Sequence, residues 1–292
     1  MTRRSASMFA SPATLRNPTH GGNRLSDRPS PAGGSRPGSA EAALTGTNVV
    51  VTGASTGIGR AIALAAAKAG ANVAITYRSE EREARAVAAE IERATHHAHV
   101  FRLDLADAAS IADLADDANR ALGRIDVWIN NAGADILTGR AANLPDTKKL
   151  DLLLSVDLRG TILASWEAVR IMREQSTGGV IVNMSWDHAL TGMAGRNPEM
   201  FAAAKGGVLG FSKSLARSVA PHLRVNVLAP GWIDTEFGGG LDAVRRRKVA
   251  RTIPLARWGT PEDVARAAVF LASPDSAYLT GQTLLIGGGA VM

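Results

Sequence analysis

Short apolar runs alternate with amphipathic segments along most of this chain, and the alternation predicts strands and helices in turn. Apolar, often β-branched runs predict buried strands at 48–52, 72–77, 100–103, 125–130, 180–184, 224–228 and 283–286. Helical spacing predicts an Ala-rich helix ending at Gly70 and further helices at 80–95, 107–122, 150–175, 201–220 and 261–272. Alternating strands and helices form right-handed crossovers, so we predict one doubly wound α/β domain over 44–292, with a parallel seven-stranded sheet and helices on both faces.

Residues 1–43 lack this pattern. They are rich in Ser, Pro, Gly and Arg and carry no apolar period, so they cannot bury enough surface to offset the entropy of ordering, and we expect disorder. The absence of an acid before Asp27 is typical of an organelle transit peptide. A dispensable tail or a mis-assigned start codon is the interpretation we favour, with the protein in the cytoplasm.

Composition narrows the class of protein. The 292 residues carry a formal net charge of +6, but residues 1–40 hold six arginines and one aspartate, which leaves a net charge of +1 for the rest. The folded part therefore gives no electrostatic case for binding nucleic acid. The chain has no cysteine, which excludes disulfides and thiolate sites. No run of 18 apolar residues is present, so we expect no membrane span.

A glycine-rich turn joins the first predicted strand to the first helix. Gly53, Gly57 and Gly59 follow the spacing Gly-x-x-x-Gly-x-Gly, a variant of the Rossmann-type dinucleotide fingerprint. Residues without Cβ let phosphates approach, and the N–H groups that begin the helix are unpaired and carry positive dipole charge. A turn between strand and helix without a ligand is the alternative.

The other strand ends converge on the same edge of the predicted sheet. Arg78, Asp104 and Asn131 each follow a strand, and ligands of doubly wound sheets bind at the carboxyl ends of the strands. The second strand ends without the acid that would bind the ribose of NAD, while Arg78 could bind a 2′-phosphate. We therefore predict NADP(H) rather than NAD(H); a solvated arginine is the alternative.

Three histidines, His96, His97 and His99, lie within four residues. Such a cluster raises the possibility of a metal site, but neighbouring carboxylates and thiolates are absent. A solvated helix end is the interpretation we favour, and we predict no metal site.

Ordered motifs over about 46–289 resemble those of the classical short-chain dehydrogenase/reductase family. They are Thr52-Gly53-x-x-x-Gly57-x-Gly59, Asp104-Leu105, Asn130-Asn131-Ala132-Gly133, Ser185, Lys205 and Pro230-Gly231. The segment from Phe201 to Phe237 is most similar to the 3-oxoacyl-carrier-protein reductase branch. The resemblance implies hydride transfer between a nicotinamide and a carbonyl or alcohol, and a homotetramer or dimer formed through the two long helices. The cofactor-binding residues we predict are Gly53, Ser55, Thr56, Gly57, Ile58, Gly59, Arg78, Asp104, Leu105, Asn131, Ala132, Gly133, Lys205, Pro230, Gly231, Ile233 and Thr235.

The catalytic positions depart from the family pattern. The Tyr-x-x-x-Lys motif reads Phe201 to Lys205, so the acid–base phenol is missing, and neither Tyr77 nor Tyr278 fits that motif. The relay asparagine is replaced by Asp157, which could form an ion pair with Lys205 or leave a water bridge in place. Ser185 is kept. A placed general acid contributes about 10²–10⁴-fold, so the change predicts a slow reductase.

An insertion between Ser185 and Phe201 supplies a replacement candidate. We hypothesise that His188 donates the proton, because histidine exchanges protons near neutral pH and Asp187 beside it would favour the charged ring. The alternative is that His188 only lines the pocket, and Glu199 is a weaker candidate. The catalytic residues we predict are thus Ser185, Lys205, Asp157 and His188.

A basic segment at 238–251 contains Arg245 to Arg247 and Lys248. The family has a mobile lid over the substrate here, and a basic patch could receive an acidic carrier protein or a phosphorylated substrate. A solvated helix face is the alternative. For the whole protein, the rival to a carbonyl reductase is a silent or non-redox member that binds NADP(H) as a scaffold or regulatory subunit.

Overall fold

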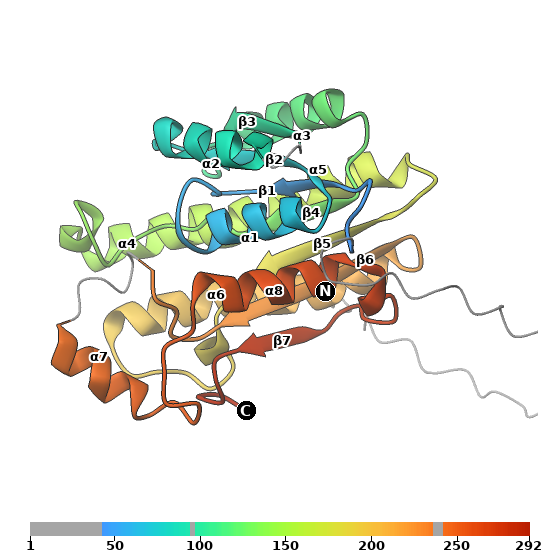
Figure 1. Ribbon diagram of the computed structural model, residues 1–292. Coiled ribbons are helices and arrows are strands. Elements are labelled where there is room, and N and C mark those ends of the chain that lie inside the picture. Colours follow the sequence, from blue (N-terminus) through green and yellow to red (C-terminus); the bar gives the residue numbers. More distant parts are fainter. Residues whose placement is uncertain (1–42, 94–96, 236–241) are drawn as a thin grey trace, which may run out of the picture. The chain divides into compact units, whose positions relative to one another are not determined.

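The computed structural model describes residues 43–93, 97–235 and 242–292. The predicted tail lies outside the described residues except for Ala43, as do His96 and part of the predicted lid. The described residues form a parallel sheet between two layers of helices (Figure 1).

All of the predicted strands are present. They are β1 (Asn48–Val51), β2 (Asn72–Tyr77), β3 (Ala98–Arg102), β4 (Val127–Asn130), β5 (Gly179–Met184), β6 (Leu223–Pro230) and β7 (Thr283–Ile286). They pair in parallel in the order β3-β2-β1-β4-β5-β6-β7. The chain runs outward from β1 to β3 and then returns to place β4 beside β1. This reversal opens a crevice at the strand ends, and it confirms the predicted doubly wound fold.

The helices divide between the two faces of the sheet. They are α1 (Gly57–Lys68), α2 (Glu81–Arg93), α3 (Ala108–Leu122), α4 (Asp146–Leu153), α5 (Thr161–Arg173), α6 (Arg196–Val219), α7 (Ala243–Ala250) and α8 (Pro261–Ala272). Buried side chains of α1, α2 and α8 form one core cluster, and those of α3, α5 and α6 form the other. Side chains alternate across each strand, so Val49 and Val51 of β1 enter the first cluster and Val50 enters the second.

Two helices differ from the prediction. The segment predicted as one helix at 150–175 begins earlier, at Asp146, and contains a π-helical stretch, η3 (Leu154–Gly160), between α4 and α5. The predicted helix at 201–220 begins at Arg196, after Gly195, whose φ of 124° suits glycine. Phe201 and Lys205 therefore lie one turn apart on the same side of α6.

Candidate active site

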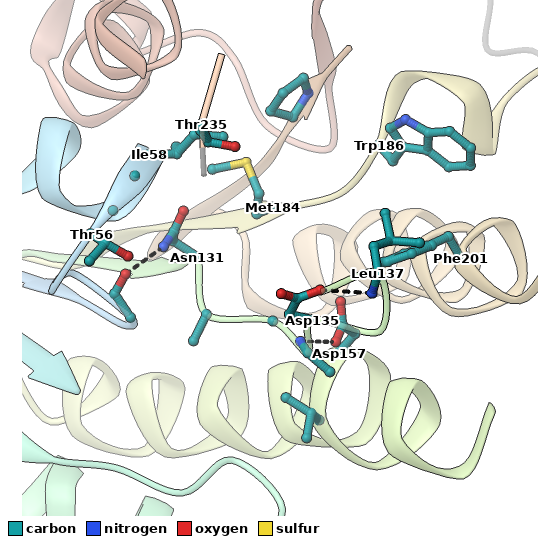
Figure 2. A pocket seen from close by; sticks show the side chains of 18 of the residues that line it. Thr56, Ile58, Asn131, Asp135, Leu137, Asp157, Met184, Trp186, Phe201 and Thr235 are labelled. Carbon is teal, nitrogen blue, oxygen red and sulfur yellow. Dashed lines mark hydrogen bonds between the residues drawn. The ribbon is translucent and has the colours of Figure 1, made fainter. Parts of the chain in front are cut away.

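A cleft of about 860 Å³ opens at the carboxyl ends of the strands (Figure 2). Every predicted cofactor-binding residue lines it, and so do Ser185, Asp157 and Lys205. Two predicted proton donors do not: His188 and Glu199 are absent from the lining. In Figure 2, Thr56, Ile58 and Thr235 lie toward one end, and Leu137, Trp186 and Phe201 lie at the other. We call the first part the cofactor end. The second, with Asp135, Asp157 and Ser185, is the substrate end.

The glycine turn at the cofactor end can pack this closely only because Cβ atoms are missing. A Cβ on Gly59 would lie 2.1 Å from the carbonyl oxygen of Gly53, and Gly53 itself has a φ of 64°. Thr56 precedes α1 and makes no side-chain capping hydrogen bond, and the first turn carries no acid. The first N–H groups of α1 can therefore bind an anion, which fits the pyrophosphate of a dinucleotide.

Asn131 fixes this turn to the end of β4. Its side-chain amide donates to the carbonyl oxygens of Thr52 and Gly53, each at 3.0 Å. The Thr52 hydroxyl in return accepts the backbone N–H groups of Asn131 at 2.9 Å and Ala132 at 3.0 Å. These bonds hold the ends of β1 and β4 in one geometry, so the predicted Asn-Ala-Gly motif stabilises the glycine turn.

The far side of the cofactor end is formed by the residues after β2. Arg78 is exposed and lines the cleft, and no ion pair joins it to another residue of the described ranges. Glu80 also lines the cleft, and its carboxylate accepts a hydrogen bond from the Ser79 hydroxyl at 2.5 Å. Desolvation, together with a hydrogen bond to Glu81, raises the pKa of Tyr77, which keeps this phenol neutral.

The predicted ion pair between Asp157 and Lys205 is present. The Lys205 Nζ lies 2.8 Å from the Asp157 Oδ2, and only 10% and 2% of the two side chains are exposed. The other oxygen, Oδ1, accepts the backbone N–H of Ala134 at 2.7 Å. Asp157 belongs to the π-helical η3, and π-helical turns occur frequently at functional sites. The pair is neutral overall and both of its members line the cleft.

Ser185 and Phe201 are the positions at which the family resemblance implies hydroxyl groups. The Ser185 hydroxyl donates to the carbonyl oxygen of Lys205 at 2.9 Å, so its proton is already engaged. The Phe201 ring packs edge-on against Trp186, with 6.3 Å between the ring centroids. Figure 2 shows Phe201 and Leu137 facing Trp186 across the substrate end. The wall where a phenol was expected is therefore apolar.

The inserted loop directs Trp186, and not His188, toward the cleft. The His188 ring stacks on Trp186 at 5.2 Å, and its Nδ1 lies 2.7 Å from the Asp187 Oδ1. Asp187 is fully buried, and its Oδ2 has no hydrogen-bond partner in the part of the chain that the structure describes. A Cβ on Gly231 would lie 2.4 Å from that oxygen, which explains the glycine after Pro230. The role of His188 as a proton donor stays a prediction that this geometry does not favour.

Several lining residues were not predicted from the sequence. Trp186, Trp232 and Trp258 line the cleft together with Leu137, Met193 and Asn197. The rings of Trp232 and Trp258 meet edge-on at 5.2 Å. A signal was available for Trp232 alone, because it directly follows the predicted Pro230-Gly231 turn.

The basic segment is helical where the structure describes it. Arg246 of α7 pairs with Asp234 at 2.7 Å, and its guanidinium lies 4.7 Å from the ring centroid of Trp258. The Trp258 Nε1 donates to the Arg246 carbonyl at 3.0 Å. One of the four basic residues is thus held against the rim of the cleft. Gly238 to Leu241 of the predicted lid lie outside the described residues.

Neither a metal site nor a membrane span was found in the part of the chain that the structure describes. No group of three or more His, Cys, Asp or Glu side chains within 43–93, 97–235 and 242–292 could hold a metal ion. Across the same ranges, none of the helices has both the length and the apolar character needed to cross a membrane.

The chain is similar to several known oxidoreductases. The family described as enoyl-(acyl carrier protein) reductase matches residues 53–291. The 3-oxoacyl-[acyl-carrier-protein] reductase FabG of Aquifex aeolicus is 38% identical over 85% of this chain and 99% of that protein. The 3beta-hydroxysteroid dehydrogenase 1 of Eggerthella lenta is 34% identical over 85% of this chain and 95% of that protein. A short-chain dehydrogenase from Burkholderia cenocepacia, solved in complex with NADP, superposes with a TM-score of 0.76 at 34% identity, over 85% of this chain and 99% of the other.

Proposed function

The chain belongs to the classical short-chain dehydrogenase/reductase family, and we propose that it transfers hydride between NADP(H) and a carbonyl or alcohol substrate. The observation that carries the proposal is the cradle at the cofactor end. Its glycine turn cannot accept a Cβ, the start of α1 is uncapped, and Arg78 lies in the same cleft. The NADP complex of the Burkholderia cenocepacia relative supports the choice of cofactor.

Each part of the cleft would hold one part of the cofactor. The start of α1 binds the pyrophosphate, Arg78 binds the 2′-phosphate, and the turn from Pro230 to Thr235 holds the nicotinamide end. A nicotinamide bound there supplies or accepts the hydride. Lys205, which forms an ion pair with Asp157, provides a positive group on the cleft wall where negative charge would develop on a substrate oxygen.

The missing phenol limits this reaction. Hydride addition to a carbonyl leaves an alkoxide that must gain a proton, and Phe201 cannot donate one. We therefore propose slow turnover of ordinary carbonyl compounds, with water or His188 as the source of the proton. The same observation favours the second candidate function, a member that binds NADP(H) as a scaffold or regulatory subunit without turnover.

Binding measurements test the cofactor. We expect NADPH to bind more tightly than NADH in titration calorimetry, and Arg78→Ala to weaken NADPH roughly tenfold while leaving NADH nearly unchanged, because only NADPH carries the 2′-phosphate. Arg82→Ala is the matched control, since Arg82 is exposed on α2 and pairs with Glu83. Failure of the wild type to bind NADPH at millimolar concentration would end the proposal.

Turnover measurements then separate the two candidate functions. NADPH consumption against a panel of carbonyl compounds should be slow but above the background rate without protein. A His188→Ala variant that matches the wild type would exclude His188 as the donor. Tight NADPH binding without any consumption would favour the scaffold.

The setting of the protein is also a proposal. We place it in the cytoplasm as a homotetramer or dimer. The exposed basic residues of α7 could receive an acidic carrier protein, as the acyl-carrier-protein relative suggests.

A further inference from the structure

The substrate end is poor in proton donors. Among its described lining residues, the titratable side chains are Asp135, Asp157 and Lys205. Asp157 and Lys205 are paired with each other, and Asp135 Oδ1 accepts the backbone N–H groups of Leu137 at 2.8 Å and Thr138 at 2.9 Å. Both carboxylates are thus committed as hydrogen-bond acceptors, and the Ser185 hydroxyl donates to a backbone carbonyl.

The same end is suited to positive charge. Its described lining holds two carboxylates and one ammonium group, and no ion pair joins Asp135 to a cation of the described residues. Its apolar walls are the rings of Trp186 and Phe201. Aromatic faces attract cations, and in this cleft the Trp258 ring already holds the guanidinium of Arg246 at 4.7 Å.

The Trp186 ring is also held in position. The buried Asp187 binds the backbone N–H of His188 and lies 2.7 Å from its Nδ1, and the His188 ring stacks on Trp186 with an interplanar angle of 17°. Asp187 and His188 are therefore positioning residues for the aromatic wall, a role that explains their place outside the cleft lining. A preset aromatic surface costs little reorganisation when a ligand binds.

From these observations we propose a further activity, which rests on the proposed hydride transfer: the reduction of bulky, aromatic iminium ions to amines. Such a reaction consumes only the hydride that a reduced nicotinamide supplies. A C–H bond forms at the iminium carbon, the π pair of the C=N bond moves to nitrogen, and the neutral amine is released with NADP⁺ as the oxidised product. No group of the protein has to donate a proton, so Phe201 is no defect for this substrate class.

The change of charge during the reaction explains why this end of the cleft would favour iminium ions over carbonyl compounds. Reduction of a carbonyl creates a new negative charge at an end whose described lining holds two carboxylates and one ammonium group, that of Lys205. Reduction of an iminium ion only moves one positive charge from the substrate to the nicotinamide, and the Asp135 carboxylate and the Trp186 ring lie in the same cleft as both.

The first test is binding by the protein without cofactor. The probes are N-methyl-3,4-dihydroisoquinolinium, a permanent cation, and α-tetralone, a neutral ketone of nearly the same shape. We expect calorimetry to show at least tenfold tighter binding of the cation. Trp186→Leu should weaken the cation roughly 3- to 30-fold more than the ketone, because it removes the aromatic face. Trp186→Phe keeps a ring and should preserve most of the difference, while Phe270→Leu, on the distant and half-exposed α8 surface, should change nothing.

The second test is turnover with NADPH. We expect reduction of the cation above the background rate without protein, with a rate nearly independent of pH, and reduction of α-tetralone at least a hundredfold slower. Equal binding and equal turnover of the two probes would overturn the inference and leave the carbonyl reductase standing. NADPH binding without reduction of the cation would overturn it as well. Loss of NADPH binding, measured separately, would overturn the proposed function and the inference together.

Discussion

Phe201 lines the cleft, at the position where the family resemblance implies a catalytic acid. Lys205 is one helical turn away, so the lysine that usually assists the phenol is still in place. Phe201→Tyr should therefore raise the rate of ketone reduction, by up to the 10²–10⁴-fold that a placed general acid typically contributes. NADPH consumption with α-tetralone measures the gain, and Phe211→Tyr, on the outer part of α6, is the control. An unchanged rate would mean that the ketone is not held against the nicotinamide.

Asp157 and Lys205 form a buried ion pair at the same end of the cleft as Phe201. Asp157→Asn should destabilise the protein by about 1–3 kcal/mol, because an amide can still accept the Ala134 N–H but leaves the Lys205 charge without a partner. In Asp157→Asn/Lys205→Met the unpaired charge is gone, so the double variant should lose less than the sum of the single losses. Urea unfolding of the wild type, Asp157→Asn, Lys205→Met and the double variant gives the coupling energy. Purely additive losses would contradict a direct interaction between the two side chains.

Single residues also show where prediction from sequence ends. The glycine turn, Arg78 and Asn131 could be placed in the cleft because each follows a strand, whereas Lys205 was predicted from the family resemblance. His188 and Trp186 could not be told apart, since neighbouring residues of an irregular loop point in directions that no period fixes. His188 was predicted to enter the cleft, but Trp186 lines the cleft and the His188 ring stacks on it.

At the scale of the elements, the apolar pattern predicted which strands and helices exist better than it predicted their internal geometry. All of the strands were found because each is a short buried run. The π-helical η3 was missed, because its apolar spacing resembles that of an α-helix while its backbone is set by packing. Gly160 shows this packing: a Cβ there would lie 2.7 Å from the carbonyl oxygen of Leu105.

The start of α8 is an element whose stability can be tested. Thr260 and Asp263 form a capping box, and Asp263 also pairs with Arg257 at 2.6 Å and Arg266 at 2.5 Å. The hydrogen bond from Arg257, together with that from the Thr260 backbone, lowers the pKa of Asp263 from 3.8 to about 2. Asp263→Asn should cost about 1–2 kcal/mol at neutral pH, because it removes the charge that pairs with Arg257 and Arg266, while the amide oxygen can still accept the Thr260 N–H.

The pH dependence of that cost follows from the direction of the shift. A carboxyl whose pKa is lower in the folded state stabilises the protein fully above its unfolded value of 3.8, and the contribution is lost as the pH falls toward about 2. The difference in unfolding free energy between wild type and Asp263→Asn should therefore be constant from neutral pH to about pH 4 and then shrink. Denaturant titrations at several pH values measure it, and Glu262→Gln, one position away in the same first turn, is the control. A difference that grows on acidification would contradict the assignment.

For the molecule as a whole, the sequence pattern predicted a doubly wound parallel sheet but not the order of each strand within it. Crossover handedness gave a parallel sheet wrapped on both faces, and the crevice between β1 and β4 followed from the reversal of direction. The shape of the substrate end could not be predicted, because its walls come from the segments after β4 and β5, from η3 and from α6, which meet only in the folded chain.

The outer surface of the two long helices bears on the predicted oligomer. Trp166 of α5 is 54% exposed and packs edge-on against Phe211 of α6 at 6.5 Å. Apart from chain neighbours and the helix's own backbone, no described atom lies within 4 Å of where a Cβ would stand on Gly206 or Gly210 of α6. An exposed tryptophan beside a partly buried phenylalanine is the kind of patch that proteins bury between subunits.

Trp166→Glu should therefore lower the molecular mass in solution, because a carboxylate placed in an apolar contact must be desolvated without a partner. Sedimentation equilibrium of the full chain measures the mass. Val244→Glu introduces the same charge at the exposed surface of α7, where it should leave the assembly intact. If the wild type sediments as a monomer, or if Trp166→Glu keeps the mass of the wild type, the predicted subunit contact through α5 and α6 is wrong. Should the assembly separate while NADPH binding persists, the cradle at the cofactor end is complete within one chain and the oligomer serves another purpose.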